Sequence, residues 1–130
     1  MNKMNHVQKR RSFIFCPGNK PDMIPKALSS GADMVCIDLE DAIIPEHKSI
    51  SRDSTVKAFE NLLSPIGVET LIRINDVNSK DGIEDINAIL NSKNTATGLM
   101  LPKIQSVEEV ENLEKKIIES NKNLNLHIII

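Results

Sequence analysis

Aromatic side chains are scarce in this sequence, which has three Phe among 130 residues and neither Trp nor Tyr. Proteins that bind single-stranded nucleic acid usually stack its bases on aromatic rings, so this scarcity argues against such a role. The net charge is −2, and acidic and basic residues are interspersed along the chain. A basic surface for nucleic acid or for a membrane is therefore not indicated either, and the core must be built mainly from Ile and Leu.

Long apolar runs are missing as well. No stretch approaches the ~18 apolar residues that a membrane-spanning helix needs. The apolar run at 12–16, which follows the basic residues Lys9, Arg10 and Arg11, is too short for a signal peptide. We therefore expect a cytoplasmic protein that begins with a disordered polar lead-in over residues 1–10.

Cysteine is rare, since only Cys16 and Cys36 occur, each in or at the end of an apolar run. No His–Cys cluster accompanies them, and His6, His47 and His127 share no metal-ligand spacing. We expect two buried free thiols that pack as small apolar groups.

The sequence does have a regular alternation of short apolar runs with amphipathic segments. The runs predict strands at 12–16, 33–39, 69–75, 97–103 and 124–130, and the segments between them predict helices at 20–30, 45–63, 81–90 and 106–120. Ser106 and Glu109 form the pattern of a capping box at the start of the last helix. Strands that are apolar throughout and alternate with helices are typical of a parallel α/β sheet.

Such a chain fits two α/β folds. One is a complete flavodoxin-like open sheet, and the other is the first five strands and four helices of a TIM (β/α)8 barrel, which needs about 250 residues to close. Strand order distinguishes them, because a barrel has the order 1-2-3-4-5 and a flavodoxin-like sheet has 2-1-3-4-5. The chain stops within the apolar run 124–130, so a truncated barrel over 11–130 is the expectation.

Charged and polar residues follow the predicted strands, at the edge where parallel α/β folds bind ligands. In chain order they are Pro17, Gly18 and Asn19, then Asp38, Glu40 and Asp41, then Arg73, then Lys103. Arg73 is unusual because it interrupts an apolar strand, and a guanidinium presents a planar fork that suits carboxylates. It either grips an anionic substrate or pairs with Glu40 or Asp41 on the neighbouring strand.

The other residues of this edge each have two interpretations. Glu40 and Asp41 can bind Mg²⁺ or orient a cation, or one of them can simply cap the next helix, and they alternate in direction if the strand continues. Lys103 can neutralise an enolate or a carboxylate, or it can be a solvated surface residue. Gly18 lets backbone N–H groups approach an anion closely, although such turns are common between a strand and a helix.

Three segments, taken in order, resemble a known family: FCPGNKP at 15–21, DLEDA at 38–42 and LPK at 101–103. They are similar to the citrate lyase β-subunit family, which includes malyl-CoA and related acyl-CoA lyases within a larger group of Mg²⁺-dependent aldolases. The resemblance covers the chain from Arg11 onward. It implies a TIM barrel that cleaves a C–C bond in a 3-hydroxyacyl thioester, of citryl or malyl type and linked to CoA or an acyl carrier protein. The products would be a keto acid and an acetyl-type thioester, with Mg²⁺ as the cofactor.

The resemblance also implies roles for residues and partners. Arg73 matches the Arg that binds the substrate carboxylate, Glu40, Asp41 and Lys103 match catalytic positions, and Pro17, Gly18 and Asn19 match a substrate-binding turn. In the family the metal-ligating Glu follows the fifth strand, so the direct Mg²⁺ ligands are expected after Ile130. Further copies of the chain or the other subunits of a lyase complex are the expected protein partners. The alternative is a degenerate, non-catalytic half-barrel that acts as a binding or assembly module.

Overall fold

The computed structural model describes residues 7–129, and residues 1–6 and 130 lie outside the described part. Its strands are β1 (Phe13–Pro17), β2 (Met34–Asp38), β3 (Glu69–Arg73), β4 (Gly98–Leu101) and β5 (Asn125–Ile128). Its helices are α1 (Met23–Leu28), α2 (Lys48–Glu60), α3 (Lys80–Asn91) and α4 (Val107–Glu119), and a 3₁₀ turn, η1 (Pro45–His47), precedes α2. Every predicted element is present, with its ends within a few residues of the predicted ones.

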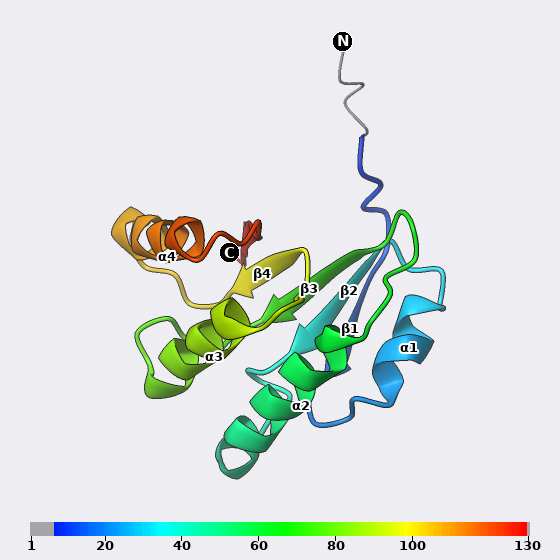
Figure 1. Cartoon of the computed structure of the whole chain (residues 1–130), viewed down its shortest axis with the longest axis horizontal. Coiled ribbons are helices and arrows are strands. Elements are labelled where there is room, and N and C mark those ends of the chain that lie inside the picture. The colour runs from blue at the N-terminus through cyan, green and yellow to red at the C-terminus, as the bar shows by residue number, and fades with distance from the viewer. Residues whose placement is uncertain (1–6, 130) are drawn as a thin grey trace.

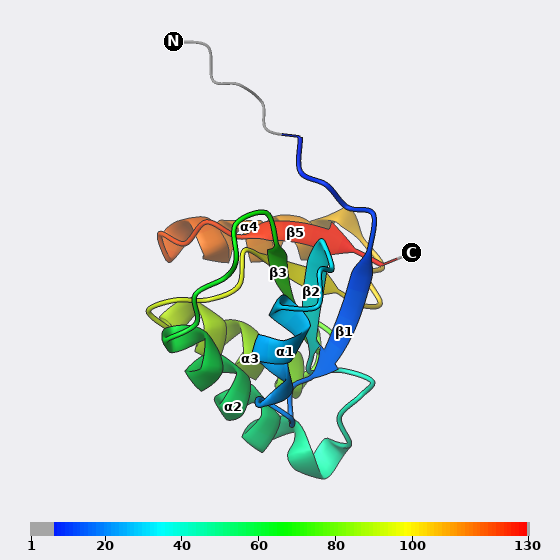
Figure 2. The ribbon, with the colours of Figure 1, turned by 90° about the vertical axis from the view of Figure 1, so that its right-hand side faces the viewer.

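The strands form one parallel sheet in the order β1-β2-β3-β4-β5. This order confirms the barrel prediction and excludes the flavodoxin-like sheet, in which the first strand lies between the second and the third. In Figure 2, β5 runs across the direction of β1, so the sheet twists and curves like a segment of a barrel wall.

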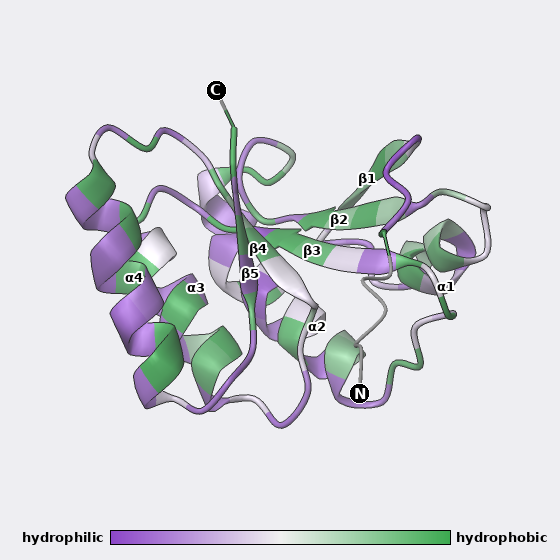
Figure 3. Ribbon diagram, turned by 90° about the horizontal axis from the view of Figure 1, so that it is seen from above, coloured by the Kyte–Doolittle hydropathy of each residue, from purple (hydrophilic) through white to green (hydrophobic). Residues whose placement is uncertain are grey.

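The helices cover the outer face of the curved sheet (Figure 1). Alternate strand residues, among them Val35, Ile72 and Leu99, point to this face and pack against apolar side chains of the helices to form the main core. Figure 3 shows the helices along the outside of the curved sheet, with apolar and hydrophilic residues alternating along each one. The core is almost entirely aliphatic, as the scarcity of aromatics predicts, with Phe59 as its one fully buried ring among the described residues.

The inner face of the sheet carries the other set of alternate residues. A smaller apolar cluster there consists of Met34, Cys36 and Leu71, with Met100 packed against it. At the carboxyl end of the strands, register places one inward row across four strands: Pro17, Asp38, Arg73 and Met100. The single cation of this row therefore stands directly beside its single carboxylate.

Helix α2 buries a different face from the one that its apolar residues predict. Its buried side chains include Ser51, Arg52 and Thr55, whereas Ile50 is 65% exposed. The reason is tertiary, because Thr55 packs beneath the turn after β1 and Arg52 forms ion pairs with α3. Of the apolar residues that recur at helical spacing here, Phe59 is buried, Val56 and Leu62 are partly buried against the core, and Ile50 and Leu63 are exposed.

The predicted polar lead-in covers residues 1–10, of which residues 1–6 lie outside the described part. Residues 7–10 have no helix or strand, yet two of them contact the start of β3. Gln8 donates a hydrogen bond to the carbonyl oxygen of Gly67 at 2.9 Å, and Arg10 pairs with Glu69 at 2.7 Å. None of the described helices is both long enough and apolar enough to span a membrane.

Candidate active site

The centre of the candidate site is an ion pair between Asp38 and Arg73, which are direct neighbours across β2 and β3. Arg73 Nε donates to Asp38 Oδ1 at 2.8 Å, and Nη2 donates to Oδ2 at 2.6 Å. This two-pronged geometry is the strongest that a guanidinium and a carboxylate can form. The Asp38 side chain is almost fully buried and that of Arg73 is 15% exposed, so the pair lies at the base of the site with one side open.

Asp38 also organises the loop that follows β2. Its two carboxylate oxygens accept hydrogen bonds from the backbone N–H groups of Glu40 and Ala42, at 2.8 and 3.0 Å. Burial alone raises the pKa of the Asp38 carboxyl, but the hydrogen bonds from Arg73 and from these N–H groups outweigh burial and lower the pKa below its usual value. Asp38 is therefore ionised, and both of its oxygens are used in hydrogen bonds within the protein.

The sequence predicts that Arg73 can pair with Glu40 or Asp41, and the pairing with Glu40 is present but is secondary to the one with Asp38. The main partner is Asp38, while Glu40 lies farther away, with 3.7 Å between Arg73 Nη1 and Glu40 Oε1. The guanidinium also lies 4.6 Å above the ring of Phe15 on β1, a cation–π contact. Asp38 and Phe15 fix the plane of the guanidinium, and neither Asp38 contact uses Nη1, which has only the long contact with Glu40.

Glu40 differs from Asp38 in having no hydrogen bond to one of its buried oxygens. Within the described residues, Glu40 Oε2 has no hydrogen-bond partner, and its nearest cation is Lys103 Nζ at 3.7 Å. Burial, followed by repulsion from Asp41, raises the pKa of the Glu40 carboxyl, although Arg73 and Lys103 act in the opposite direction. A buried carboxylate with an unused oxygen is costly, which makes this oxygen available to a ligand or a proton.

Asp41 and Lys103 lie at the open side of the site. Asp41 is exposed, while Glu40 is buried. β2 ends at Asp38, so the loop that follows the strand separates the two acids, and the alternation expected of a continuing strand does not apply. Lys103 is 65% exposed and has a φ of 53°, which turns the backbone sharply after Pro102. The turn brings an otherwise solvated ammonium group back over Glu40.

A buried turn holds the main chain beneath these side chains. Lys48, the first residue of α2, donates to the carbonyl oxygens of Leu39 and Glu40 at 3.0 and 2.5 Å. No sequence pattern singles out Lys48, and a cation at the start of a helix is usually unfavourable. Its two hydrogen bonds fix the loop that carries Glu40 and Asp41.

The turn formed by Pro17, Gly18 and Asn19 adjoins the site but has a clear structural role. The N–H group of Gly18 donates to the carbonyl oxygen of Asp38 at 2.9 Å, so it is not available to an anion. A Cβ atom at Gly18 would lie 2.7 Å from Leu39 Cδ2 and 2.8 Å from Thr55 Oγ1, which explains why glycine is needed here. Substrate contact by this turn stays a prediction.

A cavity of about 330 Å³ opens above the carboxyl ends of β2, β3 and β4. Its walls include Glu40, Asp41, Lys48, Asn75, Asp76 and Lys103. The structure thus brings Glu40, Asp41 and Lys103 together around one opening. Arg73 is not part of this lining and adjoins it through its ion pair with Glu40, with 3.7 Å between Arg73 Nη1 and Glu40 Oε1. Asn75 and Asp76, polar residues at the end of the third predicted strand, are also part of this wall.

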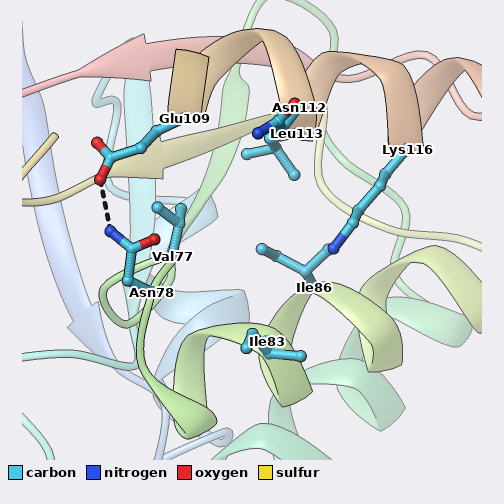
Figure 4. A pocket seen from close by; sticks show the side chains of 8 residues that line it. All are labelled: Val77, Asn78, Ile83, Ile86, Glu109, Asn112, Leu113 and Lys116. Atoms are coloured by element: carbon cyan, nitrogen blue, oxygen red, sulfur yellow. Dashed lines mark hydrogen bonds between the residues drawn. The ribbon is translucent and has the colours of Figure 1, made fainter. Parts of the chain in front are cut away.

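A second cavity of about 260 Å³ lies between α3 and α4 and contains none of the predicted site residues. In Figure 4, Asn78 reaches across its edge to Glu109 at the start of α4, and apolar side chains of both helices form its floor. These contacts connect the loop after β3 with α4, and we assign this cavity a packing role.

The residues present do not form a complete metal site. No three His, Cys, Asp or Glu side chains within residues 7–129 gather in a group that could hold a metal ion. Both oxygens of Asp38 are already used. The carboxylates that line the cavity, and can contact a hydrated cation from one side, are those of Glu40, Asp41, Asp76 and Asp81.

Comparisons with known proteins identify the family of this chain. The sequence profile of the HpcH/HpaI aldolase/citrate lyase family matches residues 11–129. The chain is 35% identical over 103 residues to human mitochondrial citramalyl-CoA lyase, and the aligned region covers 78% of this chain and 30% of that protein. It is 30% identical over 116 residues to citrate lyase subunit beta of Escherichia coli K12, which covers 89% of this chain and 37% of that protein.

A solved structure shares the fold. The citrate lyase beta subunit from M. tuberculosis, complexed with oxaloacetate and magnesium, superposes with a TM-score of 0.67 at 27% identity. The superposition covers 93% of this chain and 48% of the solved chain. The present chain therefore spans less than half the length of the relatives that it matches.

Proposed function

Since this chain belongs to the HpcH/HpaI aldolase/citrate lyase family, we propose that it carries the substrate-binding half of a C–C lyase that acts on 3-hydroxyacyl thioesters. The reaction cleaves the bond between the hydroxyl-bearing carbon and the carbon next to the thioester, giving a keto acid and an acetyl-type thioester. The relatives named above are a lyase and a lyase subunit, which favours this proposal over a non-catalytic half-barrel.

One observation carries the proposal: Asp38 holds Arg73 rigidly beside the cavity, and the Nη1 group of Arg73 has only a long contact, 3.7 Å, with Glu40. Asp38 and Phe15 fix its plane, so a ligand carboxylate can meet Nη1 without a further loss of side-chain freedom. Arg73 stays charged under all ordinary conditions, because the Asp38 hydrogen bond raises its pKa further. In this proposal it binds the carboxylate that becomes part of the keto acid.

Glu40 and Lys103 are proposed to act on the reacting part of the substrate. Glu40 has a raised pKa and an unpartnered oxygen, which suits a group that accepts or returns a proton. Lys103 places a positive charge 3.7 Å from that oxygen, where it can stabilise negative charge on the ligand. Asp41 is proposed to orient a cation or its water molecules at the mouth of the cavity.

Mg²⁺ is the proposed cofactor, supported by the magnesium in the M. tuberculosis structure named above. When bound, it would polarise the oxygen on which negative charge develops. The described residues do not supply a full ligand set, so its direct ligands must come from outside residues 7–129. We propose that Glu40 and Asp41 contact it only through water.

A panel of thioesters tests the proposal. The full-length protein is incubated with citryl-CoA, citramalyl-CoA and malyl-CoA, each with MgCl₂ or with EDTA, and the keto acid released is measured. The same acyl groups on an acyl carrier protein test the carrier. Mg²⁺-dependent release from at least one thioester is expected, and no release from any of them would refute the lyase assignment.

The size of the active particle tests the partners. The relative from E. coli is named as a subunit, which supports a proposal that this protein works within an assembly of its own copies or of lyase subunits. Light scattering on the full-length protein should give a mass above that of a single chain, and a monomer that is fully active would contradict the proposal.

A further inference from the structure

Asp85 of α3 is a fully buried carboxylate that faces the end of β3. Its Oδ2 accepts hydrogen bonds from both the backbone N–H and the side-chain Nδ2 of Asn75, at 2.9 and 2.7 Å. Its Oδ1 accepts from Arg52 Nε at 2.7 Å. Burial raises the pKa of the Asp85 carboxyl, while the groups of Asn75 and Arg52 act against this. Since every contact is a donor, the surroundings are built for the ionised form.

Arg52 compensates this buried charge from α2. Its side chain is 6% exposed and also pairs with Asp81 and Glu84, at 3.0 and 3.1 Å. These two acids are more than two-fifths exposed, so the desolvated contact is the one with Asp85. The result is a continuous chain of polar contacts from α2 through α3 to Asn75, two residues beyond Arg73.

This series of polar contacts fixes the orientation of the Asn75 amide. An amide nitrogen donates and an amide oxygen accepts, so only the nitrogen can face an ionised carboxylate. The oxygen, Oδ1, is then directed away from Asp85, and Asn75 lines the same cavity as Glu40 and Lys103. No hydrogen bond among the described residues involves this oxygen.

We propose that Asn75 contacts the ligand through Oδ1 and that Asp85 is its positioning residue, with Arg52 as the counter-ion of Asp85. The ligand group must be a hydrogen-bond donor, because an amide oxygen can only accept. Such a donor is either the hydroxyl of the 3-hydroxyacyl thioester or a water molecule on a bound cation. The identity of the ligand rests on the proposed lyase function, whereas the orientation of the amide does not.

A double-mutant cycle tests the positioning role. Asp85→Asn should lower kcat/KM about tenfold, the size of effect expected when one substrate hydrogen bond is lost. The matched control is Glu84→Gln, which removes another carboxylate partner of Arg52 from the same helix and should stay within about twofold. In an Asn75→Ala background, Asp85→Asn should cause little further loss, because both changes remove the same contact. An equal loss in both backgrounds would show that Asp85 acts only on the fold.

Nuclear magnetic resonance of the unmutated protein gives a second test that needs neither turnover nor a stable variant. One side-chain amide proton of Asn75 should be shifted downfield by its bond to a carboxylate. The Asn75 carbonyl carbon should then move on addition of citramalyl-CoA if the substrate hydroxyl is the donor, or of MgCl₂ alone if bound water is. Acetyl-CoA, which lacks the hydroxyl, is the control ligand. No movement with either probe would overturn the contact proposal, and absence of turnover with a moving carbon would overturn only the lyase proposal.

Discussion

Asp38 and Glu40 stand two residues apart at the end of β2, yet Asp38 accepts four hydrogen bonds while Glu40 Oε2 accepts none. Both side chains are buried. The pKa values of these two neighbouring carboxyls are therefore shifted in opposite directions, that of Asp38 downward and that of Glu40 upward. Asp38 stabilises the fold. Glu40 is buried with an unpartnered oxygen, which is unfavourable in free energy, and a ligand that contacts this oxygen would relieve that.

Replacement of Asp38 should be strongly destabilising. Asp38→Asn leaves the Arg73 guanidinium without its buried counter-charge, and loss of one partner of a buried pair costs about 3–5 kcal/mol, with the lower end expected because Arg73 is partly exposed. Urea unfolding followed by circular dichroism measures the change. Asp41→Asn, an exposed neighbour, is the control and should stay within about 0.5 kcal/mol. Equal effects of the two changes would contradict the structural role of Asp38.

Glu40→Gln should leave the free energy of unfolding unchanged or raise it. Because folding raises the Glu40 pKa, the folded state binds this proton more tightly, so the group's stabilising contribution is present at low pH and is lost as the pH rises through its folded pKa. The wild-type protein should therefore lose some stability between mildly acidic and neutral pH, and the variant should lose less. Unfolding midpoints measured from pH 4 to 8 compare the two, and a variant that is less stable at pH 7 would count against this assignment.

Asp33, which precedes β2 at the opposite end of the strand, should make the stability of the protein depend on pH in the acid range. The hydrogen bonds that Arg11 donates, together with the positive charge of Arg11, lower the pKa of the Asp33 carboxyl to about 2. A depressed folded-state pKa gives stability that is present at neutral pH and is lost as the pH falls toward 2. Thermal melting of Asp33→Asn should thus differ most from wild type at neutral pH and converge with it in strong acid. Parallel curves over the whole range would rule out this contribution.

Both thiols should be unreactive in the folded protein. Burial, with a smaller contribution from Asp38, raises the pKa of the Cys36 thiol to about 12, and burial also raises that of Cys16. Only a thiolate is a good nucleophile, so iodoacetamide at pH 8 should modify neither residue until urea is added. Mass spectrometry counts the adducts, and rapid labelling of Cys36 without urea would show that the inner face of β2 is open.

The sequence predicted most of the fold because each element has a strong local signal. Apolar runs located all five strands, and Ser106 with Glu109 forms the predicted capping box. The identity of the outer helix faces was less predictable. Val107 and Ile118 are apolar residues of α4 at helical spacing from its buried Leu113 and Ile117, yet they are 72% and 68% exposed.

The sequence predicts which residues lie at the site, but it does not predict which residues they contact. Parallel strands place their ends together, which is enough to gather Glu40, Lys103 and Arg73. The partner of Arg73 depends on the register between β2 and β3, which periodicity does not reveal. The buried Arg52–Asp85 pair joins residues far apart in the sequence, so no local pattern in α2 signals it.

The central claim is that Arg73 binds the substrate carboxylate, and Arg73→Lys tests it most directly, because it keeps the charge beside Asp38 but loses the planar fork. The measurement is kcat/KM of the full-length protein for the thioester that it cleaves, beside Arg10→Lys, which alters the ion pair at the other end of β3. Arg73→Lys is predicted to lose about tenfold or more, since hydrogen bonds to charged groups contribute about 1.5–3 kcal/mol, while Arg10→Lys stays within about twofold. A loss of less than about twofold for Arg73→Lys, with circular dichroism of a folded protein, would contradict the account.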